Sequence, residues 1–125
     1  MKRIIATPGA PAAVGPYSQA VIANGLLFTA GQIPLDPKTG ELVDTDIETA
    51  TKRVLDNIRA VLETEGLAFR HVVKTTVFMT DLGEFTAMNE TYATFFGSEP
   101  PARSTVGVAA LPAGARVEIE AVALA

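Results

Sequence analysis

The chain has 125 residues, of which 48% are hydrophobic, and this composition predicts a single domain over residues 1–125 with one hydrophobic core. It contains no cysteine, which excludes thiolate catalysis, disulfides and zinc sites built on cysteine, and which fits a reducing compartment. A net charge of −4 disfavours non-specific binding to nucleic acid or membranes, and no apolar stretch is long enough for a membrane span, so we expect a cytoplasmic protein.

The first third of the chain is expected to form strands and turns. Residues 2–5 are a short strand candidate, and the segment 7–16 after them contains three prolines that cannot donate to a β-ladder. Two apolar runs meet at Asn24 and Gly25, which predicts a tight hairpin because both residues tolerate a positive φ. The segment 36–40, DPKTG, predicts a second turn.

Two helices are expected in the middle of the chain. Residues 45–65 carry apolar side chains at three- and four-residue steps, the period of a helix with one buried face. Thr45 and Glu48 form the pattern of a capping box at its start, and Gly66 fits its end. A second helix is expected over 81–96, where aromatic and methionine side chains recur at helical spacing.

Three more strands complete the predicted order of elements. Residues 72–79 are rich in β-branched side chains and are expected to be buried on both faces. Residues 103–108 follow two prolines, and residues 116–125 alternate apolar and polar side chains. This order predicts an α+β domain with two helices on one face of a mixed sheet. The large apolar share leaves surface for contacts between subunits.

Arg103 is the first candidate functional residue. Pro100 and Pro101 stiffen the backbone before it, so its guanidinium is a preformed fork of donors that matches a carboxylate. The alternative is a structural ion pair with Glu118 or Glu120, on a strand expected to be adjacent. The residue types alone leave both interpretations open.

Glu118 is the second candidate. Strand alternation places it on one face with Arg116 and Glu120, opposite the apolar side chains of the same strand. A desolvated carboxylate near an arginine can position water or relay a proton. An ordinary solvated face is the alternative.

Three further residues are candidates because their residue type is unexpected at its position in the predicted structure. Tyr17 follows a rigid Gly-Pro pair that aims its phenol across a cleft, unless it is a packing residue. Asn89 lies on the apolar side of the second helix, where a buried amide must orient a loop or a ligand. Gly31 ends a strand and allows a ligand to approach the backbone, although a bulge explains it equally well.

Other chemistries lack the residues that they require. His71 is the only histidine, so a histidine-rich metal cluster and a two-histidine ribonuclease site cannot form. The chain contains no Gly-x-Ser-x-Gly elbow, no P-loop and no dinucleotide-binding glycine motif. We therefore expect no metal site and no nucleotide phosphate site.

Six stretches carry a resemblance to a known family: GPYSQA, AGQIPLDPKTGE, VVKTTVFMTDL, MNETYATFF, PPARSTVGVAALP and VEIEAVA. In this order and spacing they resemble the Rid (YjgF-like) family of reactive intermediate deaminases, most of all its RidA branch. The resemblance implies a chorismate-mutase-like fold and a homotrimer with sites between neighbouring subunits. It also implies hydrolysis of enamines and imines, such as 2-aminoacrylate and 2-iminobutanoate, to 2-oxo acids and ammonia without a cofactor or metal.

The resemblance also implies roles for individual residues. Arg103 matches the arginine that clamps the substrate carboxylate, and Glu118 matches the residue associated with the attacking water. Four further residues would complete the pocket: Tyr17, which would help to orient the substrate, Gly31, Asn89 and the backbone of Thr105.

Two positions depart from the family pattern. Thr105 stands where a cysteine is common, and Ala30 stands where a serine is common, which affects the range of substrates. Two other functions remain as alternatives: a non-catalytic binder or regulator of small 2-oxo or amino acids, and an RNA-cleaving translation inhibitor. The acidic balance and the sparse aromatic residues argue against RNA.

Overall fold

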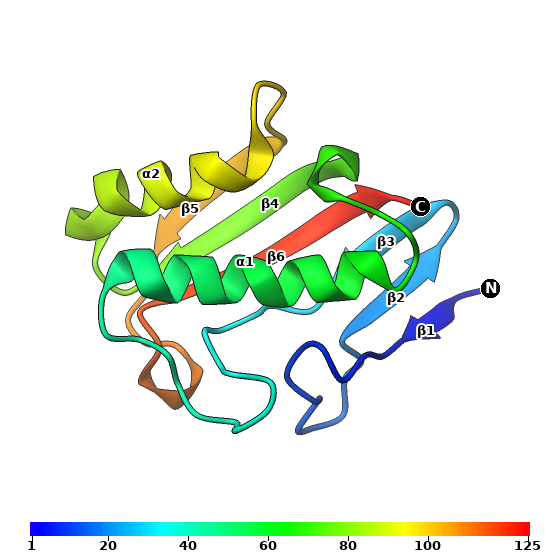
Figure 1. Cartoon of the computed structure of the whole chain (residues 1–125), viewed down its shortest axis with the longest axis horizontal. Helices are drawn as coiled ribbons and strands as arrows, with labels where there is room; N and C mark the ends of the chain where they lie inside the picture. Colours follow the sequence, from blue (N-terminus) through cyan, green and yellow to red (C-terminus); the bar gives the residue numbers. More distant parts are fainter.

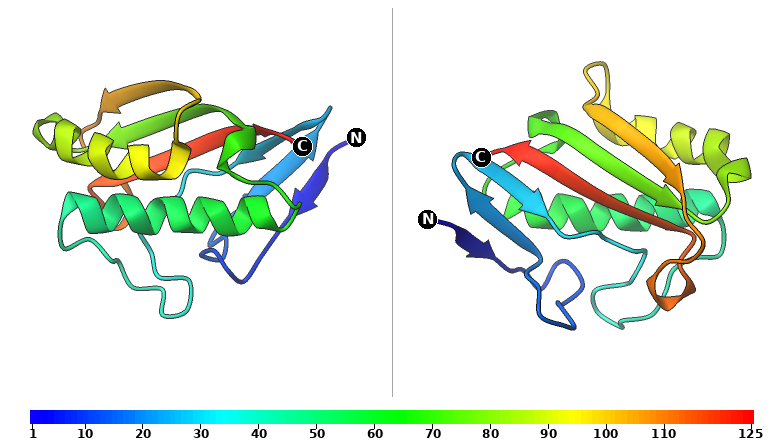
Figure 2. Two further views of the ribbon diagram at one scale, coloured as in Figure 1. Left: turned by 45° about the horizontal axis from the view of Figure 1, so that its top comes forward. Right: turned by 180° about the vertical axis from the view of Figure 1, so that it is seen from behind.

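The computed structural model describes all residues from 1 to 125 and contains one six-stranded sheet with two long helices on one of its faces (Figure 1, Figure 2). The strands are β1 (Arg3–Ile5), β2 (Ala20–Ala23), β3 (Leu26–Thr29), β4 (Val72–Met79), β5 (Ala102–Gly107) and β6 (Val117–Leu124). The long helices are α1 (Ile47–Glu63) and α2 (Phe85–Phe96), and short 3₁₀ turns are η1 (Phe69–His71), η2 (Leu82–Glu84) and η3 (Pro112–Gly114). Neither long helix has the length and apolar character needed to cross a membrane.

The order of strands in the sheet is β1-β2-β3-β6-β4-β5. Strands β4 and β5 are parallel and connected through α2, and all other neighbours are antiparallel. This confirms the expected mixed sheet with both helices on one face. The expectation that Arg103 and Glu118 lie on adjacent strands is wrong, because the last strand inserts between β3 and β4 and so leaves β4 between β5 and β6.

Helix α1 begins after a different cap from the one expected. The Thr45–Glu48 capping box is wrong: Asp46 is the N-cap, and its Oδ1 accepts a hydrogen bond from the backbone N–H of Thr49 at 2.7 Å. A carboxylate is the stronger acceptor and is favoured by the positive end of the helix dipole.

The β2–β3 hairpin has the turn that the sequence predicted. Asn24 and Gly25 have φ values of 52° and 76°, as a two-residue turn with two left-handed residues requires. This hairpin directs the chain after β3 past the first residues of β6, where Gln32 pairs with Ile119. Part of the candidate site forms there.

One continuous hydrophobic core lies between the helices and the sheet. Strand β4 therefore buries Thr75, Val77 and Met79 fully, whereas its other face is only half-buried, so the expectation of burial on both faces is wrong for the single chain. The opposite face of the sheet, seen from behind in Figure 2, bears large exposed apolar side chains: Ile4, Phe28, Val106 and Leu124.

Candidate active site

Arg103 lies on the helix-facing side of the sheet. Its partner in the β4 register is Thr75, which is only 1% exposed beneath α2. The guanidinium carbon is 4.8 Å from the ring centroid of Tyr92 and 5.5 Å from that of Phe85, both on α2. A cation over two aromatic faces keeps its charge and is restricted in position without being neutralised.

Arg103 has no carboxylate partner within its own chain, and none of the ion pairs of the chain includes it. The alternative of a structural ion pair with Glu118 or Glu120 is therefore wrong for the single chain. A hollow of about 390 Å³ borders the arginine and is lined also by Asn89, Pro100 and other residues of α2 and the loop after it. The cation is thus available to an anion that enters from outside.

Two buried polar atoms near Arg103 lack a partner. Asn89 Oδ1 and Thr105 Oγ1 are both buried and accept or donate no hydrogen bond within the chain. Thr105 lies opposite Val77, which is fully buried, so its side chain is on the same side of the sheet as Arg103. Unpaired buried polar atoms are rare and call for an explanation, and a bound ligand supplies one. The structure therefore brings Arg103, Asn89 and Thr105 to one side of the sheet.

Tyr92 is a neighbour of Arg103 that the sequence argument missed. Its hydroxyl and Thr75 Oγ1 are 2.7 Å apart in a buried hydrogen bond, while its ring lies under the Arg103 guanidinium. Burial raises the pKa of Tyr92, so the phenol stays neutral. The sequence showed Tyr92 only as part of the helix stripe; its spacing of seven residues from Phe85 is the signal that places both rings on one face.

Glu118 lies on the other face of the sheet. Its neighbours Val117 and Ile119 are fully buried against the helices, so the alternation of the strand directs Glu118 away from them. Burial is the main cause that raises the pKa of the Glu118 carboxyl, and the charge of Glu120 on the same face raises it further. The half-buried carboxyl therefore holds a proton more readily than a fully solvated carboxyl does, and its role in proton relay stays a prediction.

Gly31 is the residue that makes room for Glu118. Gln32, next to it, exchanges two backbone hydrogen bonds with Ile119, at 2.8 and 3.1 Å, which presses this segment against β6. A Cβ at position 31 would overlap the Glu118 carboxylate, with its Cδ only 2.8 Å away. The glycine is thus explained by a close approach rather than by a bulge, because any Cβ there would displace the Glu118 carboxylate.

A hollow of about 460 Å³ lies beside Glu118 and Gly31. Ala30, Ile33 and Tyr17 also line it. Tyr17 is 51% exposed, and its hydroxyl accepts only a long hydrogen bond of 3.4 Å from the backbone of Val14, so the phenol stands at the rim and is free to turn toward a ligand.

The expected site residues thus form two groups within one chain. Arg103, Asn89 and Thr105 lie between β5 and α2, whereas Glu118 and Gly31 lie on the opposite face with Tyr17 at the rim. Figure 1 shows β4 between β5 and β6, the strands that carry the two charged residues.

The comparisons with known proteins agree with this architecture. A family model described as Endoribonuclease L-PSP matches residues 7–125. The human 2-iminobutanoate/2-iminopropanoate deaminase is 45% identical to the chain, over 99% of this chain and 90% of the human protein. The chain belongs to the Rid family. This confirms the resemblance that the six sequence stretches carried.

Other members of the Rid family show the same likeness. A RutC family protein of Pyrococcus horikoshii is 51% identical, with 98% of each chain covered. The crystal structure of E. coli TdcF with bound serine has a TM-score of 0.94 against this chain at 42% identity, with 98% of each chain covered. The fold described above is therefore the fold of the family.

Proposed function

We propose that the protein hydrolyses enamine and imine intermediates, such as 2-aminoacrylate and 2-iminobutanoate, to 2-oxo acids and ammonia. The observation that supports this most is the free Arg103 cation, which is held over two aromatic rings beside a hollow that Asn89, with its unpaired amide oxygen, also lines. A small carboxylate substrate would pair with this guanidinium. The human relative is named for deamination of 2-imino acids.

The complete site is proposed to form between copies of the chain in a homotrimer. Arg103 and Glu118 lie on opposite faces of one sheet, so one chain cannot direct both at a three-carbon substrate. Two features support association: the outer edge of β5 has no strand partner, and the face opposite the helices exposes Phe28, Val106 and other apolar side chains. Each site would then combine Arg103 of one copy with Glu118 of a neighbour.

The proposed reaction uses Glu118 as a proton relay. Protonated Glu118 donates its proton to the β-carbon of 2-aminoacrylate, which becomes the N-protonated (iminium) form of 2-iminopropanoate. The Glu118 carboxylate then takes a proton from the water that attacks the iminium carbon. The resulting carbinolamine transfers its hydroxyl proton to nitrogen and releases ammonia, leaving the 2-oxo acid. The raised pKa of Glu118 keeps the protonated form available. Arg103 holds the substrate carboxylate and Tyr17 helps to orient the substrate, with Gly31, Asn89 and Thr105 completing the pocket.

We propose further that the whole chain acts as one Rid domain in the cytoplasm, without a nucleic acid or membrane partner. A second function, binding of small amino or 2-oxo acids without turnover, is favoured by one observation: the TdcF structure contains bound serine. Both functions use the same guanidinium, and only turnover separates them.

The decisive assay couples the protein to a threonine or serine dehydratase and follows ammonia and oxo-acid formation above the spontaneous rate. We expect acceleration by the native chain and none by Arg103→Ala. Arg70→Ala is the matched control, because Arg70 is exposed and forms no ion pair. Binding of 2-oxobutanoate without acceleration would support the second function, binding without turnover. Salt-sensitive RNA cleavage without deamination would support an RNA-cleaving function instead.

A further inference from the structure

The hollow beside Glu118 is lined mainly by two irregular segments, with one residue from η3, Pro112. One wall comes from residues 11–17 and the other from residues 30–35. Neither wall is part of a strand. The second is joined to β6 only where Gln32 pairs with Ile119, so side-chain hydrogen bonds are a further source of rigidity for both walls.

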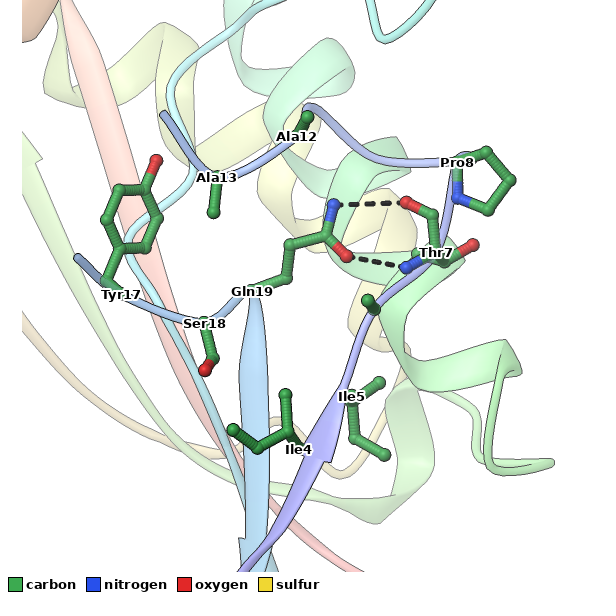
Figure 3. Close-up of a pocket in the computed structure, with 10 residues that line it drawn as sticks. Ile4, Ile5, Thr7, Pro8, Ala12, Ala13, Tyr17, Ser18 and Gln19 are labelled. Atoms are coloured by element: carbon green, nitrogen blue, oxygen red, sulfur yellow. Dashed lines mark hydrogen bonds between the residues drawn. The ribbon is translucent and has the colours of Figure 1, made fainter. Parts of the chain in front are cut away.

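A single buried carboxamide holds the first wall. Gln19 is only 5% exposed, and its Nε2 donates to the backbone oxygens of Thr7, Ala10 and Pro11 at 3.0, 3.2 and 2.7 Å. Its Oε1 accepts a hydrogen bond from the backbone N–H of Thr7 at 2.6 Å. Figure 3 shows the Gln19 side chain crossing the loop to Thr7, with Tyr17 nearby on the same segment. Gln19 therefore closes the loop whose end carries Tyr17.

A second buried carboxamide holds the other wall. Asn57, on α1, is fully buried, and its Nδ2 donates to the backbone oxygens of Ile33 and Leu35 at 3.4 and 3.0 Å. Its Oδ1 accepts a hydrogen bond from Arg53 Nη2 at 2.9 Å, which fixes the orientation of the amide. Because Ile33 follows directly from the Gly31 segment, Asn57 anchors the wall that touches Glu118.

We propose that Gln19 and Asn57 are positioning residues that hold the two loop walls of the Glu118 hollow at the separation the reaction requires. They act through the backbone of residues 7–11 and 33–35. Without one of these amides, the corresponding wall loses its side-chain hydrogen bonds, shifts, and lets water in beside the carboxylate. The kinetic consequence rests on the proposed deaminase function, but the structural consequence does not.

Isosteric variants test this without changing side-chain size. Gln19→Met and Asn57→Leu remove the amide, and Asn57→Asp keeps an acceptor for Arg53 while it loses the donor to Leu35. Val61→Ala is the control, since Val61 is a fully buried core residue on the same helix and does not line the hollow. Two quantities are measured for each: kcat and KM in the dehydratase-coupled assay, and the Glu118 titration by carboxyl ¹³C NMR.

We expect kcat to fall at least about tenfold in Gln19→Met, Asn57→Leu and Asn57→Asp with a smaller change in KM, because a misplaced reacting group lowers turnover. The Glu118 pKa should move down toward its ordinary value as water enters. Val61→Ala should change neither quantity, although it lowers the melting temperature.

Two results would overturn the proposal: native kinetics and native Glu118 titration in all three variants, or equal effects in Val61→Ala. If the native protein lacks deaminase activity, the proposed function fails, while the Glu118 titration still decides the positioning claim. If Asn57→Leu does not fold, Gln19→Met and Asn57→Asp carry the test.

Discussion

The Arg103 region and the Glu118 region are built in different ways. Arg103 is carried by a regular strand and rests on rings of a regular helix, so its position follows from secondary structure and aromatic packing. Glu118 is also on a strand, but its surroundings are two loops that are tied by buried amides. The comparison teaches that a permanent cation needs only a surface that supports it, here the aromatic rings of α2. A carboxyl with a raised pKa needs surroundings that exclude water.

The largest expected effect is on the Arg103 side. Arg103→Ala should lower kcat/KM by about a hundredfold to ten-thousandfold, because two charge-assisted hydrogen bonds of about 1.5–3 kcal/mol each are lost with the substrate carboxylate. The melting temperature should fall only modestly, since two cation–π contacts are lost but no ion pair within the chain is broken. Steady-state kinetics should be compared with those of Arg103→Lys, which keeps the charge but not the two parallel donors, to show whether geometry or charge dominates. Native activity in Arg103→Ala would rule out Arg103 as the carboxylate-binding residue.

On the Glu118 side, Gly31→Ala should lower kcat about 10–100-fold. The new Cβ would overlap the Glu118 carboxylate and force it out of place. The double variant Gly31→Ala/Glu118→Ala relieves this overlap, so thermal unfolding should show it to be more stable than Gly31→Ala, although it stays inactive. Equal melting temperatures for the two would mean that the close approach is absent in solution.

A smaller effect is expected at Tyr92, where loss of the hydroxyl should lower stability but leave activity nearly unchanged. Tyr92→Phe keeps the ring under Arg103 but leaves the buried Thr75 hydroxyl unpaired, which costs about 1–2 kcal/mol in the free energy of unfolding. Activity should stay within about twofold of native. Urea unfolding measures the loss, and Thr75→Val/Tyr92→Phe should restore most of it; a large loss of activity in Tyr92→Phe would give the hydroxyl a role in the reaction.

The smallest expected effect is the pH dependence of stability from Glu118. Its pKa is raised in the folded chain, so the folded state binds its proton more tightly than the unfolded state does. The contribution of Glu118 therefore becomes less favourable as pH rises from its ordinary pKa through the folded one. Urea unfolding at pH 4 and pH 8 should show Glu118→Gln gaining stability relative to the native chain as pH rises. If Glu118→Gln instead loses stability relative to the native chain as pH rises, the Glu118 carboxylate has a cationic partner in the assembled protein.

The helices, strands and hairpin could be predicted from the sequence, but the order in which the strands pair in the sheet could not. Periodicity and residue type identified both helices and the strands, although α2 begins at Phe85 rather than at residue 81, and the Asn24–Gly25 pair identified the hairpin. These features depend on neighbours in the chain. The position of β6 between β3 and β4 depends on long-range pairing, so the relation of Arg103 to Glu118 was mispredicted.

The same division holds for the candidate site. Arg103, Asn89 and Gly31 stood out because each residue type was unusual in its local pattern, and the structure supplies a reason for each. Gln19, Asn57 and Tyr92 did not, because an amide or a phenol on a helix or strand is recognised as important only when its distant partner is known. No local signal in the sequence pairs Asn57 with Leu35.

The central claim is that each site joins Arg103 of one chain to Glu118 of another, and a mixture of two inactive variants tests it directly. Arg103→Ala and Glu118→Gln are each assayed alone, then unfolded together and refolded at equal amounts. Sites shared between neighbours should regain up to about a quarter of native activity, because about one site in four then contains both native residues. No recovery above the separate variants, in a mixture that forms mixed oligomers, would contradict the account.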